Sequence, residues 1–199
     1  RILVETVAAF AAIVPLATPA SAQQSQPPKP ADDVKIMSWN IWHGGREDGK
    51  EVGPQRVIQV IKDSGADLVA MQETYGSGEH IAKQLHFHPR GTNVSIHSRF
   101  AIVEDISVYK EFECVGALVE LPNKTRLAFY SIWLPYSAEI WEEGTRDTSK
   151  PETMLAACKA SHVSLQAMWA AIDKRLADAK YQDVPIVIAG DFNSMSHID

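Results

Sequence analysis

Cysteine is scarce in this sequence, and its scarcity limits the kinds of site the protein can hold. The 199 residues include only Cys114 and Cys158, and no cluster of Cys and His residues has the composition of a zinc site. Cys114 falls in an apolar stretch that predicts a strand, and Cys158 falls on the apolar face of a predicted helix. A disulfide and two buried thiols are both compatible with this pattern.

The sequence also has fewer basic residues than acidic ones. The chain has 19 Lys and Arg residues against 25 Asp and Glu residues, a net charge of −6 and a pI of about 5.6. A protein that binds long duplex DNA without sequence preference usually carries a basic surface. The composition therefore disfavours such a protein, although a local basic patch remains compatible with it.

A hydrophobic stretch long enough to span a membrane is missing as well. The apolar run Ile2–Ala17 has sixteen residues, contains Glu5, and precedes the small-residue sequence Thr18–Ala22. Residues 1–22 are therefore predicted to be a signal peptide, which makes the protein secreted or periplasmic and leaves it without a stable membrane span. Because Arg1 is not an initiator methionine, we expect the natural N-terminus to lie upstream.

The remainder of the chain is predicted to be a tether followed by one domain. Residues 23–33 are polar and rich in proline, a composition typical of a disordered linker. Residues 34–199 are long enough for one domain, and the 45% hydrophobic content of the chain is ordinary for a globular core.

Three apolar segments of this domain end in polar residues. Residues 34–42 alternate as a strand that contains Asn40, residues 67–74 form a short apolar run that ends near Glu73, and residues 185–194 are a buried strand followed by Gly-Asp-Phe-Asn-Ser. Open α/β proteins place their chemistry where apolar strands end. We therefore expect the polar residues to meet at one end of a sheet.

The segments between these strands predict a mixture of helices and strands. Helices are expected from Gly53-Pro54 to Gly65, over 78–85, and from a Ser149-x-x-Glu152 capping box to about Lys180. Strands are expected as a pair at 92–97 and 101–108, and as a hairpin at 113–121 and 126–134.

Taken together and in this order, Asn40, Glu73 and the Gly190–Ser194 turn resemble the endonuclease/exonuclease/phosphatase superfamily. This superfamily includes pancreatic deoxyribonuclease, apurinic endonucleases, neutral sphingomyelinases and inositol polyphosphate 5-phosphatases. The resemblance runs from about Val34 to Asp199 and implies a four-layer α/β sandwich, with two packed mixed β-sheets flanked by helices. Relatives continue beyond this turn to a late Asp-His pair, so the domain is expected to be C-terminally incomplete here.

The same residues predict metal-assisted hydrolysis of a phosphoester. A carboxylate such as Glu73 suits Mg²⁺ or Mn²⁺ better than zinc, and Glu73 is the predicted metal ligand. By resemblance, Asn40 orients the metal carboxylate and the scissile phosphate, Asp191 positions or deprotonates the attacking water, and Asn193 donates to a phosphate oxygen. The absent histidine would be the general base or would stabilise charge.

Five further residues are candidates for substrate contact. His43 follows the first strand, Arg99 lies in a turn, and His197 lies just beyond the Gly-Asp-Phe-Asn-Ser turn. Trp133 stands where relatives often carry His or Tyr, and its indole can donate a hydrogen bond but cannot take a proton. Tyr136 is the other candidate donor. A purely structural role remains open for Tyr136, and Arg99 is equally consistent with a solvated turn.

The predicted function is an exported, Mg²⁺-dependent phosphoesterase, acting as a monomer on a small or lipid-borne phosphoester. A secreted nuclease of the same superfamily is one alternative. A noncatalytic binding module that keeps the fold but has lost the base is another. Residues 136–150 form a long segment of mixed charge, which predicts either a specificity loop or a plain surface loop.

Overall fold

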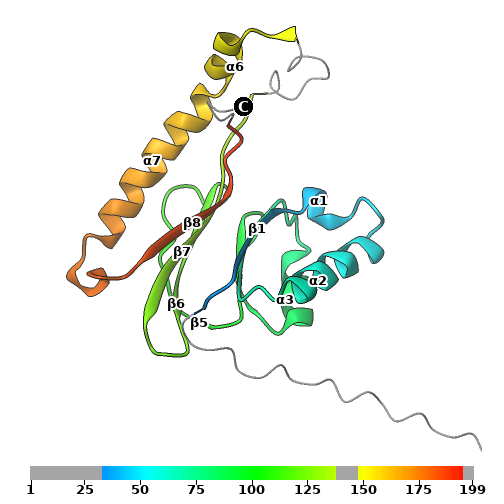
Figure 1. Ribbon diagram of the computed structural model, residues 1–199, viewed down its shortest axis with the longest axis vertical. Helices are drawn as coiled ribbons and strands as arrows, with labels where there is room; N and C mark the ends of the chain where they lie inside the picture. The colour runs from blue at the N-terminus through cyan, green and yellow to red at the C-terminus, as the bar shows by residue number, and fades with distance from the viewer. Residues whose placement is uncertain (1–32, 138–147, 195–199) are drawn as a thin grey trace, which may run out of the picture. The chain divides into compact units, whose positions relative to one another are not determined.

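The computed structural model describes residues 33–137 and 148–194, and the predicted signal peptide and nearly all of the predicted linker lie outside these ranges. The described residues form two four-stranded β-sheets with helices on their outer faces (Figure 1). No helix in the described ranges is both long and apolar enough to cross a membrane.

The first sheet has the strand order β1-β2-β4-β3. Strands β1 (Ile36–Asn40) and β2 (Leu68–Gln72) are parallel, with Asn40 opposite Gln72, whereas β4 (Ser95–Ser98) runs antiparallel to both β2 and β3 (His88–Gly91). Because β1 and β2 are parallel, their carboxyl ends lie at the same end of the sheet.

The second sheet has the order β5-β6-β7-β8. Strands β5 (Ala101–Asp105), β6 (Cys114–Glu120) and β7 (Arg126–Trp133) are antiparallel neighbours, and β8 (Ile186–Asp191) pairs in parallel with β7, with Trp133 opposite Asp191. Both sheets are mixed, and β1 and β8 end on the same side of the molecule in Figure 1. The predicted α/β sandwich is confirmed.

Strand alternation divides the apolar side chains into three layers of core. One face of each sheet contributes to a core between the sheets, which contains Leu68, Ala70, Val115 and Phe129. The outer face of the first sheet packs against α2 (Val52–Ser64) and α3 (Gly78–Leu85). The outer face of the second sheet packs against helix α7 (Lys159–Leu176).

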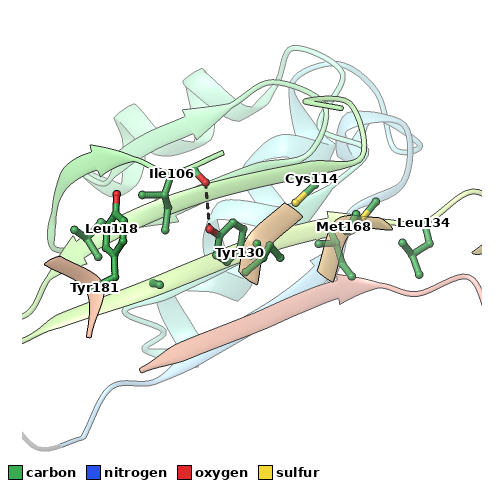
Figure 2. Close-up of a cluster of buried hydrophobic side chains, with 10 residues drawn as sticks. Ile106, Cys114, Leu118, Tyr130, Leu134, Met168 and Tyr181 are labelled. Carbon is green, nitrogen blue, oxygen red and sulfur yellow. Dashed lines mark hydrogen bonds between the residues drawn. The ribbon is translucent and has the colours of Figure 1, made fainter. Parts of the chain in front are cut away.

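Figure 2 shows the core beneath α7, where Tyr130 and Met168 lie among Ile106, Cys114, Leu118, Leu134 and Tyr181. The hydroxyl of Tyr130 donates to the backbone carbonyl of Ile106 at 3.2 Å, so the buried phenol has a partner. Cys114 and Cys158 are both buried thiols, and they do not form a disulfide. Burial raises the pKa of the Cys114 thiol to about 12, which keeps it protonated and unreactive.

Helix α2 presents one apolar face to the core and ends at a glycine cap. In α2 the buried positions are Val57, Ile58 and Ile61, whereas Val60 is exposed because it lies about 100° around the helix from Ile61. The predicted end of this helix is confirmed, because Gly65 adopts the left-handed cap and donates to the carbonyl of Lys62.

The single long helix expected from 149 to 180 is wrong. The chain forms α6 (Pro151–Ala157), α7 and the 3₁₀ turn η1 (Ala179–Tyr181), with Cys158 at the first junction. The predicted capping box also fails, because the helix begins at Pro151 and no side chain caps it. Proline suits the first helical turn without such a cap, since it has no N–H to satisfy.

The predicted strand pair at 92–97 and 101–108 is also wrong, since β4 and β5 belong to different sheets. The intervening turn is held by Asp67, whose carbonyl accepts from the Arg99 N–H at 2.8 Å and whose carboxylate accepts from the Arg99 guanidinium at 3.1 Å. This anchored corner carries the chain from one sheet to the next. The hairpin predicted at 113–121 and 126–134 is confirmed as β6 and β7.

Candidate functional site

Three polar side chains from both sheets meet where the strands end. The amide nitrogen of Asn40 donates to Oε1 of Glu73 at 2.8 Å and to Oδ2 of Asp191 at 3.0 Å. Asn40 ends β1, Glu73 directly follows β2, and Asp191 ends β8, so one amide group joins a carboxylate from each sheet. We call Asn40, Glu73 and Asp191 the site cluster.

The left-handed backbone conformation of Glu73 directs its side chain into this cluster. In β2 the side chains of Leu68, Ala70 and Gln72 point between the sheets, so simple alternation would place Glu73 on the opposite, helix-covered face. The backbone of Glu73 instead has a φ of 59°, which ends the strand and redirects the side chain towards Asn40. The Glu73 side chain is buried, and its Oε2 accepts from the backbone N–H of His43 at 3.3 Å.

The helix labelled α1 (Trp42–Gly45) is a single left-handed turn beside Glu73. Its residues have φ values of 55°, 47°, 74° and 68°, a conformation that costs L-residues about 1–2 kcal/mol each. Gly44 donates to the Glu73 carbonyl at 2.6 Å, and a Cβ on Gly44 would lie 2.8 Å from the carbonyl oxygen of Thr74. Glycine is therefore required there, and the strained turn holds two backbone N–H groups at Glu73.

A second turn shapes Asp191. Its Oδ1 accepts from the Asn193 N–H at 3.0 Å, and its backbone carbonyl accepts from Leu134 N–H at 2.9 Å. The side chain of Asn193 donates to the Leu134 carbonyl at 2.7 Å and is nearly buried. Asn193 is predicted to contact a phosphate oxygen, and in the structure one of its two amide hydrogens instead fastens the turn to the end of β7.

Beneath the cluster, a buried hydrogen bond ties the two sheets together. Gln72 donates from Nε2 to the Ser131 hydroxyl at 3.0 Å, and both residues are fully buried. Gln72 lies opposite Asn40 in β1 and immediately precedes Glu73. The bond fixes the spacing of the sheets directly below the carboxylates, so it helps to set the distance between Glu73 and Asp191.

The donor set of the site cluster fits a hard divalent cation. Glu73 and Asp191 accept hydrogen bonds from neutral donors, and no ion pair between described residues supplies either with a cation. The described residues contain no group of three or more Asp, Glu, His or Cys side chains arranged around a metal. Mg²⁺ usually takes one or two protein carboxylates and completes its shell with water and substrate phosphate, so Glu73 suffices as the protein ligand and Asp191 remains available to act on water.

Some of the predicted substrate residues lie near the site cluster and others do not. His43 lies at the cluster through its backbone, while its ring bonds Glu47 at 2.9 Å. Trp133 lies opposite Asp191 in the β7–β8 pair, and its ring meets the exposed Tyr136 edge-on at 6.2 Å. His197 lies outside the described residues.

Arg99 does not approach the cluster, so its predicted phosphate contact is wrong. It follows Ser98, which pairs with Leu68 at the start of β2, whereas Glu73 follows the other end of that strand. The guanidinium binds Asp67 and the Ala66 carbonyl and lies over the Phe87 ring. Arg99 therefore anchors the corner between the sheets.

Two other histidines have contrasting surroundings. His162 is exposed and bonds the Ser194 hydroxyl at 2.9 Å. His97 is fully buried beneath α3 and contacts Ser95 at 3.0 Å. Burial lowers the pKa of His97 to about 4 from an ordinary value of 6.5.

Acidification is expected to destabilise the fold through His97. The folded state keeps His97 neutral while the unfolded chain protonates it near pH 6.5, so stability is complete above that pH and falls towards pH 4. The loss amounts to about 3 kcal/mol at pH 4. Chemical denaturation at pH 7, 5.5 and 4 measures it, with His97→Gln expected to flatten the pH dependence and the exposed His88→Gln as the control. Equal pH slopes in all three proteins would exclude His97 as the cause.

Sequence reasoning missed three residues next to the cluster. Tyr75 is partly exposed, and partial burial of its hydroxyl, together with the Glu73 carboxylate and Tyr136, raises the pKa of that hydroxyl. Asn93 is buried, has no side-chain partner in the described part of the chain, and its carbonyl accepts from Thr74 N–H. Glu113 precedes β6, and its carbonyl accepts from Trp133 N–H. Alternation from Val115 points Glu113 between the sheets, a signal already present in the sequence.

Comparison with known proteins agrees with this geometry. Residues 37–198 match the model of the endonuclease/exonuclease/phosphatase family. The chain belongs to this family. Its resemblance to the family in the order of Asn40, Glu73 and Asp191 is thereby confirmed, although the roles of the individual residues remain predictions.

One relative and two solved structures are similar to this chain. An uncharacterized Caenorhabditis elegans protein, F14F9.5, is 24% identical over 187 residues, which cover 85% of this chain and 56% of that protein. A humanized D. rerio TDP2 is 15% identical with a TM-score of 0.57, covering 82% of this chain and 63% of the other. A mannosyl-6-phosphatase from Bacteroides thetaiotaomicron is 15% identical with a TM-score of 0.50, covering 81% and 66%. The chain thus spans less than two thirds of each of these proteins, and the structural likeness establishes the fold.

Proposed function

We propose that this family member is an exported phosphoesterase that depends on a divalent metal and hydrolyses a small or lipid-borne phosphoester. The observation that carries the proposal is the amide of Asn40, which joins Glu73 and Asp191 from the two sheets. Proteins of this family hydrolyse phosphoesters. Metal-assisted hydrolysis needs charged oxygen ligands, and the site cluster supplies carboxylates. The apolar N-terminal segment supports export.

The chemistry assigns separate tasks to the two carboxylates. Mg²⁺ or Mn²⁺ bound by Glu73 would neutralise the charge that develops on the phosphate oxygens. Asp191 orients a water molecule and takes one of its protons as the water oxygen bonds to phosphorus. The bond from phosphorus to the leaving oxygen breaks, and that oxygen takes up a proton. Asn40 holds both carboxylates in place during this exchange.

The leaving oxygen has no proton donor among the predicted residues. Trp133 stands opposite Asp191, and an indole can hydrogen-bond a phosphate oxygen but cannot transfer a proton. The leaving oxygen therefore takes its proton from solvent water, and the late Asp-His pair that the family resemblance implies would act as general base or stabilise charge. The test therefore uses the protein extended to its natural stop codon.

A nuclease is the second candidate, because one similar structure is D. rerio TDP2 complexed with a single-strand DNA product, at 16% identity and a TM-score of 0.54. The mannosyl-6-phosphatase supports the small-substrate alternative. The net charge of −6 favours the latter, since binding a long polyanion usually requires basic surface.

A substrate panel separates these functions. The extended protein is assayed with a sugar monophosphate, a phospholipid headgroup ester and a single-stranded oligonucleotide, each with Mg²⁺ and again after removal of the metal by EDTA. We expect hydrolysis of one of the first two, loss of that activity in EDTA and recovery on adding Mg²⁺. Faster cleavage of the oligonucleotide would favour the nuclease. Absence of all three activities would favour a noncatalytic binding module.

A further inference from the structure

Exposed aromatic side chains gather around the site cluster. Trp42, Tyr75, Phe112 and Tyr136 each expose between 42% and 55% of their surface. His43 and Trp133 link them to the cluster, because the His43 N–H contacts Glu73 and Trp133 lies opposite Asp191. We call these six residues the aromatic rim.

The rings of the rim contact one another in two groups. On the side of the first sheet, Trp42 stacks on His43 with centroids 4.7 Å apart, and His43 lies 6.3 Å from Tyr75. On the side of the second sheet, Trp133 meets Phe112 at 5.5 Å and Tyr136 at 6.2 Å, both edge-on. The two groups flank the site cluster, one next to Glu73 and the other next to Asp191.

The backbone also favours presentation of these rings. Trp42, His43 and Tyr75 all have positive φ, at 55°, 47° and 38°, although bulky residues rarely adopt this conformation. Glycine would satisfy each position more easily. Large aromatic residues at these strained positions are typical of a functional site.

Most of the exposed aliphatic side chains lie on other elements, although Val52 begins α2 next to Gly53, which packs against Gly45 of the α1 turn. Val60 lies on α2, Val103 on β5, Leu155 on α6, Val163 on α7 and Ile186 at the start of β8. A site for an acyl chain would be lined by such aliphatic groups. A surface of exposed ring faces beside a phosphate-binding cluster instead matches a planar ring, which stacks favourably on aromatic faces.

We propose that the aromatic rim binds a planar aromatic ring carried by the phosphoester substrate, with Trp42 as the principal stacking surface. The inference rests on the proposed function for the position of the phosphate and adds the class of group attached to it. One face of Trp42 is occupied by His43, and its 55% exposure leaves the other available. The favoured ligand is a small aryl or nucleoside phosphate, since the chain is acidic.

Two nonhydrolysable phosphonates test this proposal without requiring turnover. Benzylphosphonate and cyclohexylmethylphosphonate have the same charged group and similar size, but only the first carries an aromatic ring. Binding to the extended protein with Mg²⁺ is followed by titration of the phosphonate ³¹P resonance. We expect benzylphosphonate to bind about 2- to 10-fold more tightly, the range that aromatic pairing supplies.

Variants identify the surface responsible. Trp42→Gly removes the ring and suits the left-handed backbone, so the protein should remain folded while the preference for benzylphosphonate falls to about one. Trp169→Ala removes an equally exposed tryptophan from α7 and should keep the preference. Equal affinities of the unaltered protein for the two phosphonates, or an unchanged preference in Trp42→Gly, would overturn the proposal.

A third ligand distinguishes the source of the ring. If a short oligothymidylate bound far more tightly than benzylphosphonate, the ring would belong to a nucleic-acid strand. The assignment of a small aryl or nucleoside phosphate would then be overturned. Loss of hydrolysis with the aryl preference intact would contradict only the proposed enzymatic function. Hydrolysis of phosphoesters with no aryl preference would contradict only the role of the rim.

Discussion

Glu73→Gln in the extended protein is expected to lower kcat by about 100-fold or more and to raise the Mg²⁺ concentration needed for half-maximal activity. The amide keeps the size of the side chain, and its one oxygen can accept from either Asn40 or the His43 N–H, so the fold should persist with one hydrogen bond fewer. What it loses is the negative charge that a hard cation requires. Steady-state kinetics across a Mg²⁺ titration measures both effects, and circular dichroism checks the fold.

Glu79→Gln is the matched control for this change. Glu79 lies in the first turn of α3 and is exposed, so the substitution removes the same charge away from the cluster. Its kinetics should match those of the unaltered protein. If Glu73→Gln had the same turnover and metal titration as Glu79→Gln, Glu73 would not be a metal ligand.

Asp191→Asn should lower kcat more than Asn193→Ala does. The first change removes the carboxylate that handles the water, a role worth about 100- to 10,000-fold. The second removes a hydrogen bond to the Leu134 carbonyl and places alanine at a φ of 41°, so much of its effect should be on stability. The combined cost is about 1–3 kcal/mol of unfolding free energy.

The two variants are separated by measuring kcat against pH together with urea denaturation. Asp191→Asn should change the pH profile of kcat, and it should lower the denaturation midpoint less than Asn193→Ala does, because its one amide oxygen keeps one of the two hydrogen bonds that Asp191 accepts. Asn193→Gly serves as the control for backbone strain, because glycine accepts positive φ but lacks the amide. Equal losses of kcat and the same pH profile for Asp191→Asn and Asn193→Ala would refute the division of labour between them.

Several features were predictable because they depend on local pattern. The ends of strands β1, β2 and β8 follow from apolar runs that stop at polar residues, and the β6–β7 hairpin follows from its turn sequence. Gly65 marks the end of α2 for a similarly local reason, its left-handed conformation. The family resemblance rested on the order of these short motifs, and the match over residues 37–198 confirms it.

The predictions that failed depend on contacts between distant segments rather than on local pattern. The prediction of a strand pair at 92–108 failed because partner choice depends on the Asp67–Arg99 contact, which joins residues distant in sequence. Leu155 and Trp169 are exposed although they fit a helical apolar pattern, because the chain divides into α6 and α7 and only one side of α7 faces the sheet. Periodicity specifies a face but not the partner that covers it.

The sequence by itself determined the fold class, the family and the identity of the polar residues at the strand ends, because each depends on short patterns in the chain. The tertiary structure decided which of them meet. Parallel pairing places Asn40 and Glu73 at one end of the first sheet, and packing of the second sheet against it adds Asp191 and the second group of rings in the aromatic rim. Arg99 was left at the opposite end for the same reason. Proximity between distant segments is set by strand order and by backbone turns such as those at Trp42 and Glu73, which no local pattern in the sequence specifies.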